Sequence, residues 1–318
     1  MNTNGSHHGH RNISAAGLFI TLGIIFGDIG TSPLYVMKAI VGEGQMIDRL
    51  VVLGGVSLVF WTLTLQTTIK YVLLTLRADN KGEGGIFSLY TLVRRRERWL
   101  LYPALLGGAA MISDGMITPP ISVSSAVEGL GIKYPGLPTM GIAIAIISIL
   151  FFVQRFGTAA VGKSFGPIMF VWFLVLGILG LMNIGHDLEV LSALSPHYGV
   201  KLLFSHPKGV YILGAVFLCT TGAEALYADL GHCGRENIQV SWIFVKTCLV
   251  LNYLGQAAWL LHHQGQHLED NPFFGMMPEW FVWPGILIAT LAAIIASQAL
   301  ISGSFTLVSE AIRLGLLP

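Results

Sequence analysis

Long apolar stretches with few charges recur along almost the whole chain. About 20 apolar residues are what an α-helix needs to cross the hydrocarbon core of a bilayer. Of the 318 residues, 53% are hydrophobic and only 11% are charged, whereas soluble domains carry about 25% charged residues. The sequence therefore predicts an all-α integral membrane protein. We expect eight membrane-spanning helices, over residues 14–40, 51–76, 100–127, 139–154, 164–184, 209–231, 238–261 and 280–312.

The series of spans predicts a single transmembrane domain over residues 14–318, because no long polar segment interrupts it. A polar tail over residues 1–13 precedes this domain, and its Gly, Asn, Ser and His content predicts disorder. The tail lacks the basic start, apolar core and cleavage site of a signal peptide. We therefore expect the first span to direct insertion into the bilayer.

The basic residues indicate the orientation, because short loops rich in Lys and Arg stay on the cytoplasmic side. The loop between the second and third spans is the richest, and we expect it and the N-terminus to be cytoplasmic. Its basic residues are Arg77, Lys81, Arg94, Arg95, Arg96 and Arg98. The formal net charge of +1 offers no electrostatic surface for nucleic acid. No nucleic-acid partner is predicted.

The first span contains GDIGTSPLY, residues 27–35, which a regular helix would not tolerate. Pro33 has no N–H to donate to the preceding turn, and the glycines weaken the helix around it. Lipid cannot satisfy the backbone oxygens that are released, so such a break must be buried in protein or line a wet cavity. We expect the break to turn Asp28 and Tyr35 toward the protein interior.

A second interruption is predicted in the sixth span, within CTTGAEALYADLG at residues 219–231. There the small residues Thr221 and Gly222 precede the acid Glu224. Spans one and six begin the two halves of an inverted-repeat transporter, in which paired interrupted helices point to a central substrate site. We therefore expect helices 1 and 6 to be broken beside the substrate.

The third span carries a stripe of oxygen-bearing side chains. Asp114, Thr118 and Ser122 recur every fourth residue, a spacing that places them on one helix face. Pro119 and Pro120 remove backbone donors beside this stripe, so we expect loosened carbonyls there. Spacing and backbone chemistry both indicate a polar site on this helix.

Three acids, Asp28, Asp114 and Glu224, are predicted at membrane depth. A charge there costs at least about 2.5 kcal/mol on insertion scales, which marks each acid as a functional candidate. The alternative is a structural role, in which they pair with Lys70, Lys246 or one another. Carboxylates, hydroxyls, a phenol and free carbonyls are hard oxygen ligands that suit alkali cations, although such a set does not separate sodium from potassium.

Several motifs in register resemble the KUP/HAK/KT family of potassium uptake permeases. GDIGTSPLY matches that family's first-helix motif, and the others follow in family order. They are RADNKGEGG at 77–85, ITPPISVSSAVEGL at 117–130, GTAAVGK at 157–163, CTTGAEALYADLGH at 219–232 and NPFF at 271–274. The resemblance implies a LeuT-like inverted-repeat bundle of the amino-acid/polyamine/organocation superfamily, multi-pass in the plasma membrane, here the bacterial inner membrane.

The resemblance also implies potassium uptake with protons by alternating access, without enzyme activity or cofactor. Potassium would be held chiefly by Asp28 and Asp114. By matching position, its full set of ligands would be Asp28, Tyr35, Asp114, Thr118, Ser122 and Thr221. Glu224 is the candidate carrier of the coupling proton, because a carboxylate withdrawn from water holds a proton more readily; Asp114 is the alternative carrier. Asp79 and Glu83 are candidates for an inner gate, with a solvated glycine turn as the alternative.

Members of that family are about twice as long, so the resemblance implies a bundle truncated after about eight helices. A homodimer, or a second chain that supplies the missing helices, is the corresponding partner, besides potassium, protons and the bilayer. Two other functions stay open. One is a symporter of another small solute, such as an amino acid, which would need positive helix ends facing a carboxylate. The other is an inactive truncated fragment.

Overall fold

The computed structural model describes residues 13–80, 82–94, 96–134, 136–154, 162–313 and 315. Residues 1–12 of the predicted tail, residues 157–161 of the GTAAVGK motif, and Lys81 and Arg95 lie outside the described residues. Every named element in the described part is a helix. The prediction of an all-α chain is confirmed.

Six helical segments are long and apolar enough to cross a membrane. They are Arg49–Arg77, Arg98–Lys133, Ser164–Ile184, Gly209–Ala228, Arg235–His262 and Val282–Arg313. A seventh candidate is the bent pair Ala15–Ile24 and Gly27–Leu34, whose axes differ by 66°. These bounds agree closely with seven of the predicted spans.

The prediction of eight spans is too high for the described residues. The segment predicted over 139–154 forms α7 (Thr139–Gln154), an apolar helix of 16 residues. At 1.5 Å per residue it reaches about 24 Å, less than the roughly 30 Å of a hydrocarbon core. The described part therefore holds six or seven candidate spans and one shorter apolar helix.

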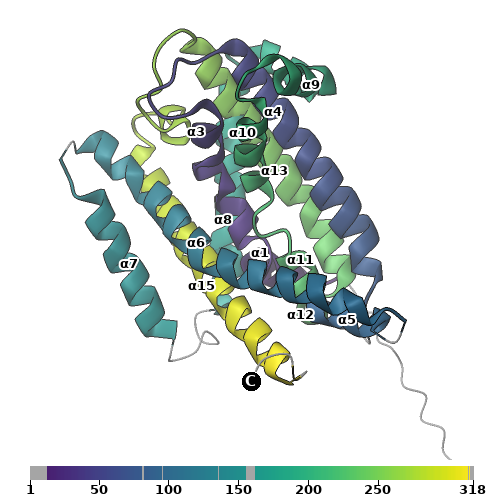
Figure 1. Cartoon of the computed structure of the whole chain (residues 1–318). Coiled ribbons are helices and arrows are strands. Elements are labelled where there is room, and N and C mark those ends of the chain that lie inside the picture. Colours follow the sequence, from purple (N-terminus) through teal and green to yellow (C-terminus); the bar gives the residue numbers. More distant parts are fainter. Residues whose placement is uncertain are drawn as a thin grey trace, which may run out of the picture.

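Two groups of long helices make up the bundle (Figure 1). In one group, α8 (Gly162–Ile184) packs along α13 (Arg235–His262) and against α1 (Ala15–Ile24). In the other, α15 (Val282–Arg313) packs along α6 (Leu101–Lys133), and α7 lies on their outer side. The second span is α4 (Arg49–Thr62) continued by the π-helical η2 (Leu63–Leu74).

Glycines let α8 and α13 approach closely. A Cβ atom at Gly255 would lie 2.6 Å from the Cα of Gly180, a separation that real Cβ atoms do not adopt. Small residues at helix crossings are the usual means of packing in a membrane, where lipid tails give no hydrophobic drive for helices to associate. The close contact between α8 and α13 therefore depends on two glycines, Gly180 on α8 and Gly255 on α13.

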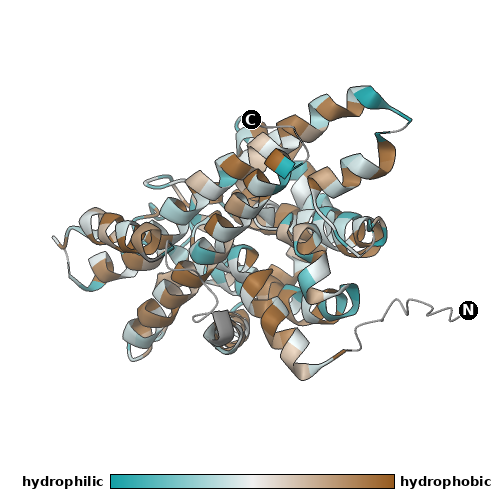
Figure 2. Ribbon diagram, turned by 90° about the horizontal axis from the view of Figure 1, so that it is seen from below, coloured by the Kyte–Doolittle hydropathy of each residue, from teal (hydrophilic) through white to brown (hydrophobic). Residues whose placement is uncertain are grey.

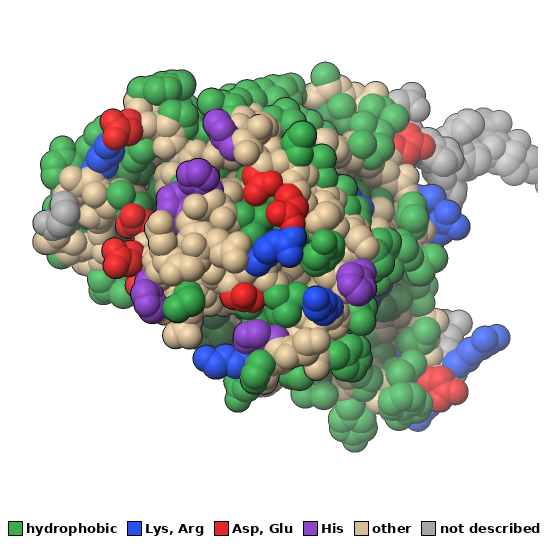
Figure 3. Space-filling model, turned by 90° about the horizontal axis from the view of Figure 1, so that it is seen from above, with side chains coloured by type: hydrophobic (Ala, Val, Ile, Leu, Met, Phe, Trp, Pro, Cys, Tyr) green, Lys and Arg blue, Asp and Glu red, His purple; other side chains and the backbone are tan. Residues whose placement is uncertain are grey.

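Apolar residues recur along the long helices (Figure 2), and many of their side chains are exposed. Leu106 on α6, Ile144 on α7 and Leu287 on α15 are all more than half exposed. Exposed apolar surface of this extent is unfavourable in water but not against lipid tails. Charged side chains and histidines gather instead on the end of the molecule seen from above in Figure 3.

The first span is irregular at two places. α1 ends at Ile24, and α2 (Gly27–Thr31) starts after the bend, so the main break precedes Asp28. Pro33 lies in the 3-10 turn η1 (Ser32–Leu34), from which α3 (Val36–Val41) continues. The predicted interruption is confirmed, although the sharp bend lies one turn or more before the proline.

The sixth span is interrupted as predicted. α10 (Gly209–Phe217) passes into the 3-10 turn η6 (Leu218–Thr220), and residues 221–224 form a turn before α11 (Ala225–Ala228). A second short helix, α12 (Leu230–Cys233), follows. Helical hydrogen bonding is therefore lost directly beside Glu224.

The third span is not broken. α6 runs without interruption from Leu101 to Lys133, with Pro119 and Pro120 inside it. The fixed φ of proline is compatible with a helix, and a neighbouring bundle tolerates the missing donors. The expected loosening therefore does not disturb the helical spacing of Asp114, Thr118 and Ser122.

Candidate functional site

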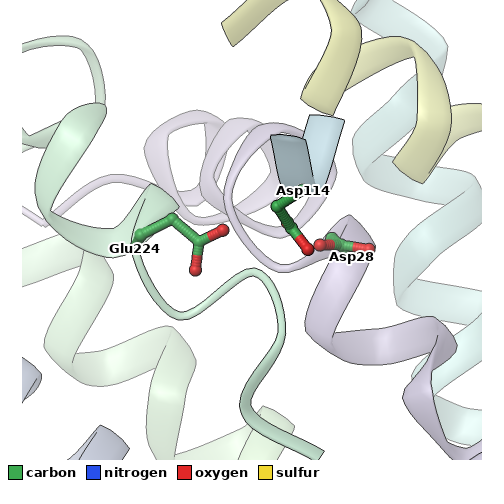
Figure 4. A group of neighbouring side chains, drawn as sticks. All are labelled: Asp28, Asp114 and Glu224. Atoms are coloured by element: carbon green, nitrogen blue, oxygen red, sulfur yellow. The ribbon is translucent and has the colours of Figure 1, made fainter. Parts of the chain in front are cut away.

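Three carboxylates converge in the middle of the bundle (Figure 4). One oxygen each of Asp28, Asp114 and Glu224 lies within 4.8 Å of the other two. They come from α2, from α6 and from the turn that precedes α11. The two interrupted spans and the third span therefore meet at one cluster of acids, which we call the acid cluster.

The backbone of the sixth span lies directly against Asp28. A Cβ atom at Gly222 would lie 2.7 Å from the Cβ of Asp28 and 2.9 Å from the N of Ile29. Gly222 also has φ +87°, a conformation that L side chains rarely adopt. Only glycine at position 222 lets the two breaks come this close.

Among the described residues, two carboxylate oxygens of the acid cluster have no hydrogen-bond partner. They are Asp28 Oδ2 and Asp114 Oδ2, both buried, whereas Asp114 Oδ1 accepts a hydrogen bond from Thr118 Oγ1 at 2.7 Å. A buried charged group without a partner is strongly unfavourable. The arrangement therefore calls for a cation or protons among these oxygens.

Lys70 and Lys246, the two lysines named as structural partners, contact other groups in the described part of the chain. Lys246 Nζ donates to the hydroxyls of Thr64 and Thr68 at 3.0 and 3.1 Å. Lys70 lies over the ring of Tyr71, 5.2 Å from its centroid. Across the described ranges, the three acids of the cluster form no ion pair with Lys, Arg or His. The structural alternative based on lysine is therefore not what the structure adopts.

Tyr35 and Ser122 adjoin the acid cluster. The Tyr35 hydroxyl lies 3.3 Å from Ser32 Oγ and also beside Ser122. Ser122 Oγ in turn lies 3.3 Å from Thr31 Oγ1, which links α6 to α2. These hydroxyls are buried. They form a polar extension of the acid cluster along the first and third spans.

Thr221 is the predicted ligand with the weakest observed connection to the acid cluster. It follows η6, is half-buried, and its N–H bonds to Leu218 O at 3.3 Å. In the part of the chain that the structure describes, its hydroxyl makes no hydrogen bond to the other predicted ligands. It lies next to Gly222, one residue from the contact with Asp28.

Side chains already occupy several carbonyls of the broken first span. The donors come from α8, from α13 and from the start of α14 (Pro272–Gly275). The bonds are Trp172 Nε1 to Gly30 O, Gln256 Nε2 to Pro33 O and Asn271 Nδ2 to Leu34 O, at 2.9, 2.9 and 2.8 Å. Each of these three carbonyls therefore accepts a hydrogen bond from another helix or from the start of α14.

A cavity of about 600 Å³ connects the acid cluster to one end of the molecule. Asp28 and Glu224 line its inner part, and Glu83, Glu310 and Arg313 line it farther out. This is the end at which α5 (Ile86–Val93), α12 and the C-terminal end of α15 lie (Figure 1). A cation in the acid cluster therefore has a route to that end.

The two predicted gate residues have different positions. Glu83 lines the cavity, and its carboxylate lies so close to Gly231 that a Cβ atom there would clash with it. Asp79 is exposed, and its Oδ2 accepts a hydrogen bond from the N–H of Gly82 at 2.8 Å. Asp79 therefore holds the glycine turn, whereas Glu83 faces the route.

The loop that carries these residues is docked on the sixth span. Tyr227 Oη donates to Ala78 O at 2.5 Å. Gly84 lies directly on the carbonyl of Tyr227, where a side chain would not fit. The loop and α11 therefore form one packed unit beside the cavity.

Sequence reasoning missed some residues of the site. Thr31 lies inside the first motif, three residues after Asp28, and its hydroxyl lies 3.3 Å from that of Ser122. Its place beside a predicted ligand in the sequence was the signal that could have identified it. Trp172 and Gln256 gave no local signal, because their carbonyl partners lie 142 and 223 residues away. Only the folded bundle brings these donors to the break.

The chain matches a family described as K+ potassium transporter, integral membrane domain, over residues 15–318. It is similar to proteins named probable potassium transport system protein Kup. The one from Cytophaga hutchinsonii is 63% identical over 317 residues, which are 98% of this chain and 48% of that protein. Those from Flavobacterium johnsoniae and Clostridium perfringens are 60% and 56% identical, over 97% and 96% of this chain and 48% and 49% of theirs.

The chain thus spans about half the length of these curated relatives. No solved structure matches it significantly.

Proposed function

The chain belongs to the K+ potassium transporter family, and we propose that it forms the cation-binding part of a potassium uptake system in the plasma membrane. The family predicted from the motifs is confirmed, and it is a family of transporters rather than of enzymes. The acid cluster carries the proposal, because three carboxylates gather at a buried point without a basic partner among the described residues.

Potassium is held chiefly by Asp28 and Asp114 in this proposal. Their carboxylates converge with that of Glu224, and one buried oxygen of each has no hydrogen-bond partner among the described residues. Hydroxyl oxygens complete the shell, replacing the water that the ion loses. The hydroxyls proposed for this role are those of Tyr35, Thr118, Ser122 and Thr221.

Glu224 carries the coupling proton. It lies in the turn of the interrupted sixth span and lines the cavity, so water can exchange a proton with it. Its partner in the cluster, Asp114, is less suited, because one of its oxygens is engaged by Thr118. A membrane potential of 100 mV supplies about 2.3 kcal/mol for each charge moved inward.

Transport follows alternating access on a LeuT-like inverted repeat. Support comes from the two interrupted spans, which meet at the acid cluster as this architecture requires. The cavity opens at the end that carries the basic loop, which we place in the cytoplasm with the N-terminus. Further helices, from the same polypeptide or a second chain, complete the bundle, and a homodimer is compatible with it.

Uptake of radioactive rubidium into cells that lack their own potassium systems tests this function. Cells that produce the chain together with the helices that complete its bundle should accumulate rubidium, and Asp28→Asn or Asp114→Asn should each reduce the rate by about tenfold or more, as expected for removal of a ligand charge. The matched control is Asp270→Asn, an exposed acid outside the spans. Equal uptake by all three variants would remove the proposed site. Glu224→Gln should abolish the acidification that accompanies potassium entry.

A further inference from the structure

The end of the molecule opposite the cavity mouth holds an ion pair between the first and third spans. Lys38 Nζ on α3 donates to Glu128 Oε1 on α6 at 2.5 Å. Their side chains are 19% and 31% exposed, so the pair is largely withdrawn from solvent. Glu128 lies fourteen residues beyond Asp114 on the same helix, about 21 Å along its axis.

Asn271 of the NPFF motif, at the start of α14, joins this ion pair. Asn271 Nδ2 donates both to Glu128 Oε2 at 2.9 Å and to Leu34 O at 2.8 Å. Its Oδ1 accepts from the N–H of Phe273 and so caps α14. One amide side chain therefore ties α14 to the broken first span and to the third span.

The two phenylalanines fill the space behind these polar contacts. Phe273 is fully buried and its ring lies 5.6 Å from that of Trp172. Phe274 packs so tightly on α6 that a Cβ atom at Gly129 would lie 2.8 Å from its ring. Neither ring belongs to the acid cluster, so their packing at this end calls for an explanation of its own.

We propose that Lys38, Glu128, Asn271 and the two phenylalanines form a seal that closes the end opposite the cavity and opens when the cation site turns to that side. These contacts join α3, α6 and α14. A cation that passes between the first and third spans at this end requires these elements to separate. A largely buried ion pair held also by an amide gives two discrete states, closed or separated, because removing one partner leaves a charge without compensation. The role of the seal in transport rests on the proposed function, but the opening of the seal can be measured without a transport assay.

Thiol labelling from each side of the membrane tests the seal. The reporter is Thr31→Cys, a buried position between the acid cluster and the seal, and the natural cysteines are all buried. The probe is a membrane-impermeant methanethiosulfonate added to sealed vesicles of known orientation that contain the chain. Protein without the reporter gives the background.

Glu128→Gln should raise labelling from the seal side by about fivefold or more, because it shifts the population toward the open seal. Lys38 also pairs with Glu43, whose side chain is 72% exposed. Glu43→Gln should therefore change the labelling rate by less than about twofold. Arg49→Gln breaks an ion pair with Glu189 outside the seal and should behave likewise. Exchange of charges in Lys38→Glu with Glu128→Lys should return labelling toward the parent rate.

Asn271→Ser provides an independent variant if Glu128→Gln does not fold. Serine keeps the cap of α14 but lacks the amide that donates to Glu128 and Leu34. It should also raise labelling from the seal side. Parent rates in both variants, or an equal rise in Arg49→Gln, would overturn the seal. Failure of rubidium uptake alone would count against the proposed function and leave this result standing.

Discussion

Gly222 determines how closely the sixth span approaches Asp28. Its positive φ and its contact with the Asp28 side chain leave no room for a Cβ atom. The sequence indicated a small residue beside a break, but it did not indicate which acid that residue would contact. The site therefore depends on the missing side chain of Gly222 as well as on the three carboxylates.

Gly222→Ala should weaken rubidium binding to the purified chain and lower its free energy of unfolding by about 1–3 kcal/mol, the cost of a strained backbone residue. Equilibrium binding and thermal unfolding in detergent measure both effects. Gly214→Ala on α10 is the control, because a Cβ atom there meets nothing within 4 Å. Equal behaviour of the two variants would show that the close approach is unimportant.

Thr118 orients Asp114 through its hydroxyl. Thr118→Val should weaken rubidium binding by about tenfold, since a hydrogen bond to a charged group contributes roughly 1.5–3 kcal/mol. Thr118→Ser retains the hydroxyl and should bind nearly as well as the parent chain. If valine and serine have the same effect, the hydroxyl does not support Asp114.

The broken first span is held by side chains of other helices rather than by its own hydrogen bonds. Trp172, Gln256 and Asn271 each donate to a carbonyl near the break. These donors keep the backbone satisfied where lipid could not. The break is therefore a fixed part of the bundle in this state, and the acid at position 28 is held with it.

Gln256→Leu should lower the free energy of unfolding by about 1–3 kcal/mol, because it leaves a buried carbonyl at Pro33 without a donor. Thermal unfolding of the purified chain in detergent measures this loss. Gln264→Leu, at an exposed position of the following loop, should have little effect. A stable Gln256→Leu variant would mean that the break does not need this donor.

Helix existence was predictable because apolar length is a local property of the sequence, and seven of the predicted spans lie close to their observed bounds. The segment over 139–154 was counted as a span although its helix is short, since apolar content alone does not measure reach. The prolines of the third span did not loosen α6, because the surrounding bundle tolerates them. The donors at the first break were not predictable, since contacts across 142 and 223 residues are set only by folding.

At the scale of the whole molecule, the two ends differ. The cavity opens beside the loop that contains Arg94, Arg96 and Arg98, whereas Lys38 and Glu128 form an ion pair at the opposite end, where we propose the seal. The proposed cytoplasmic position of the basic loop would make this cavity face inward. The proposed alternating access requires the interrupted spans to open the acid cluster to the other end as well.

This orientation predicts the sides at which exposed residues can be labelled. A cysteine at Glu97 should react with an impermeant thiol reagent only from the cytoplasm, and one at Asp270 only from outside. Both positions are exposed; Glu97 lies in the loop before α6, and Asp270 lies just before α14, at the end of the proposed seal. Labelling of both from the same side would contradict the membrane topology, and reversed labelling would invert the direction of the cavity.

The acid cluster as a potassium site is tested most directly by equilibrium binding of radioactive rubidium to the purified chain, in competition with potassium. The account predicts saturable binding that Asp28→Asn and Asp114→Asn each weaken by about tenfold or more, equivalent to at least about 1.4 kcal/mol. Binding by Asp270→Asn should equal that of the parent chain. Undiminished binding in both Asp28→Asn and Asp114→Asn, with both variants folded, would contradict the account.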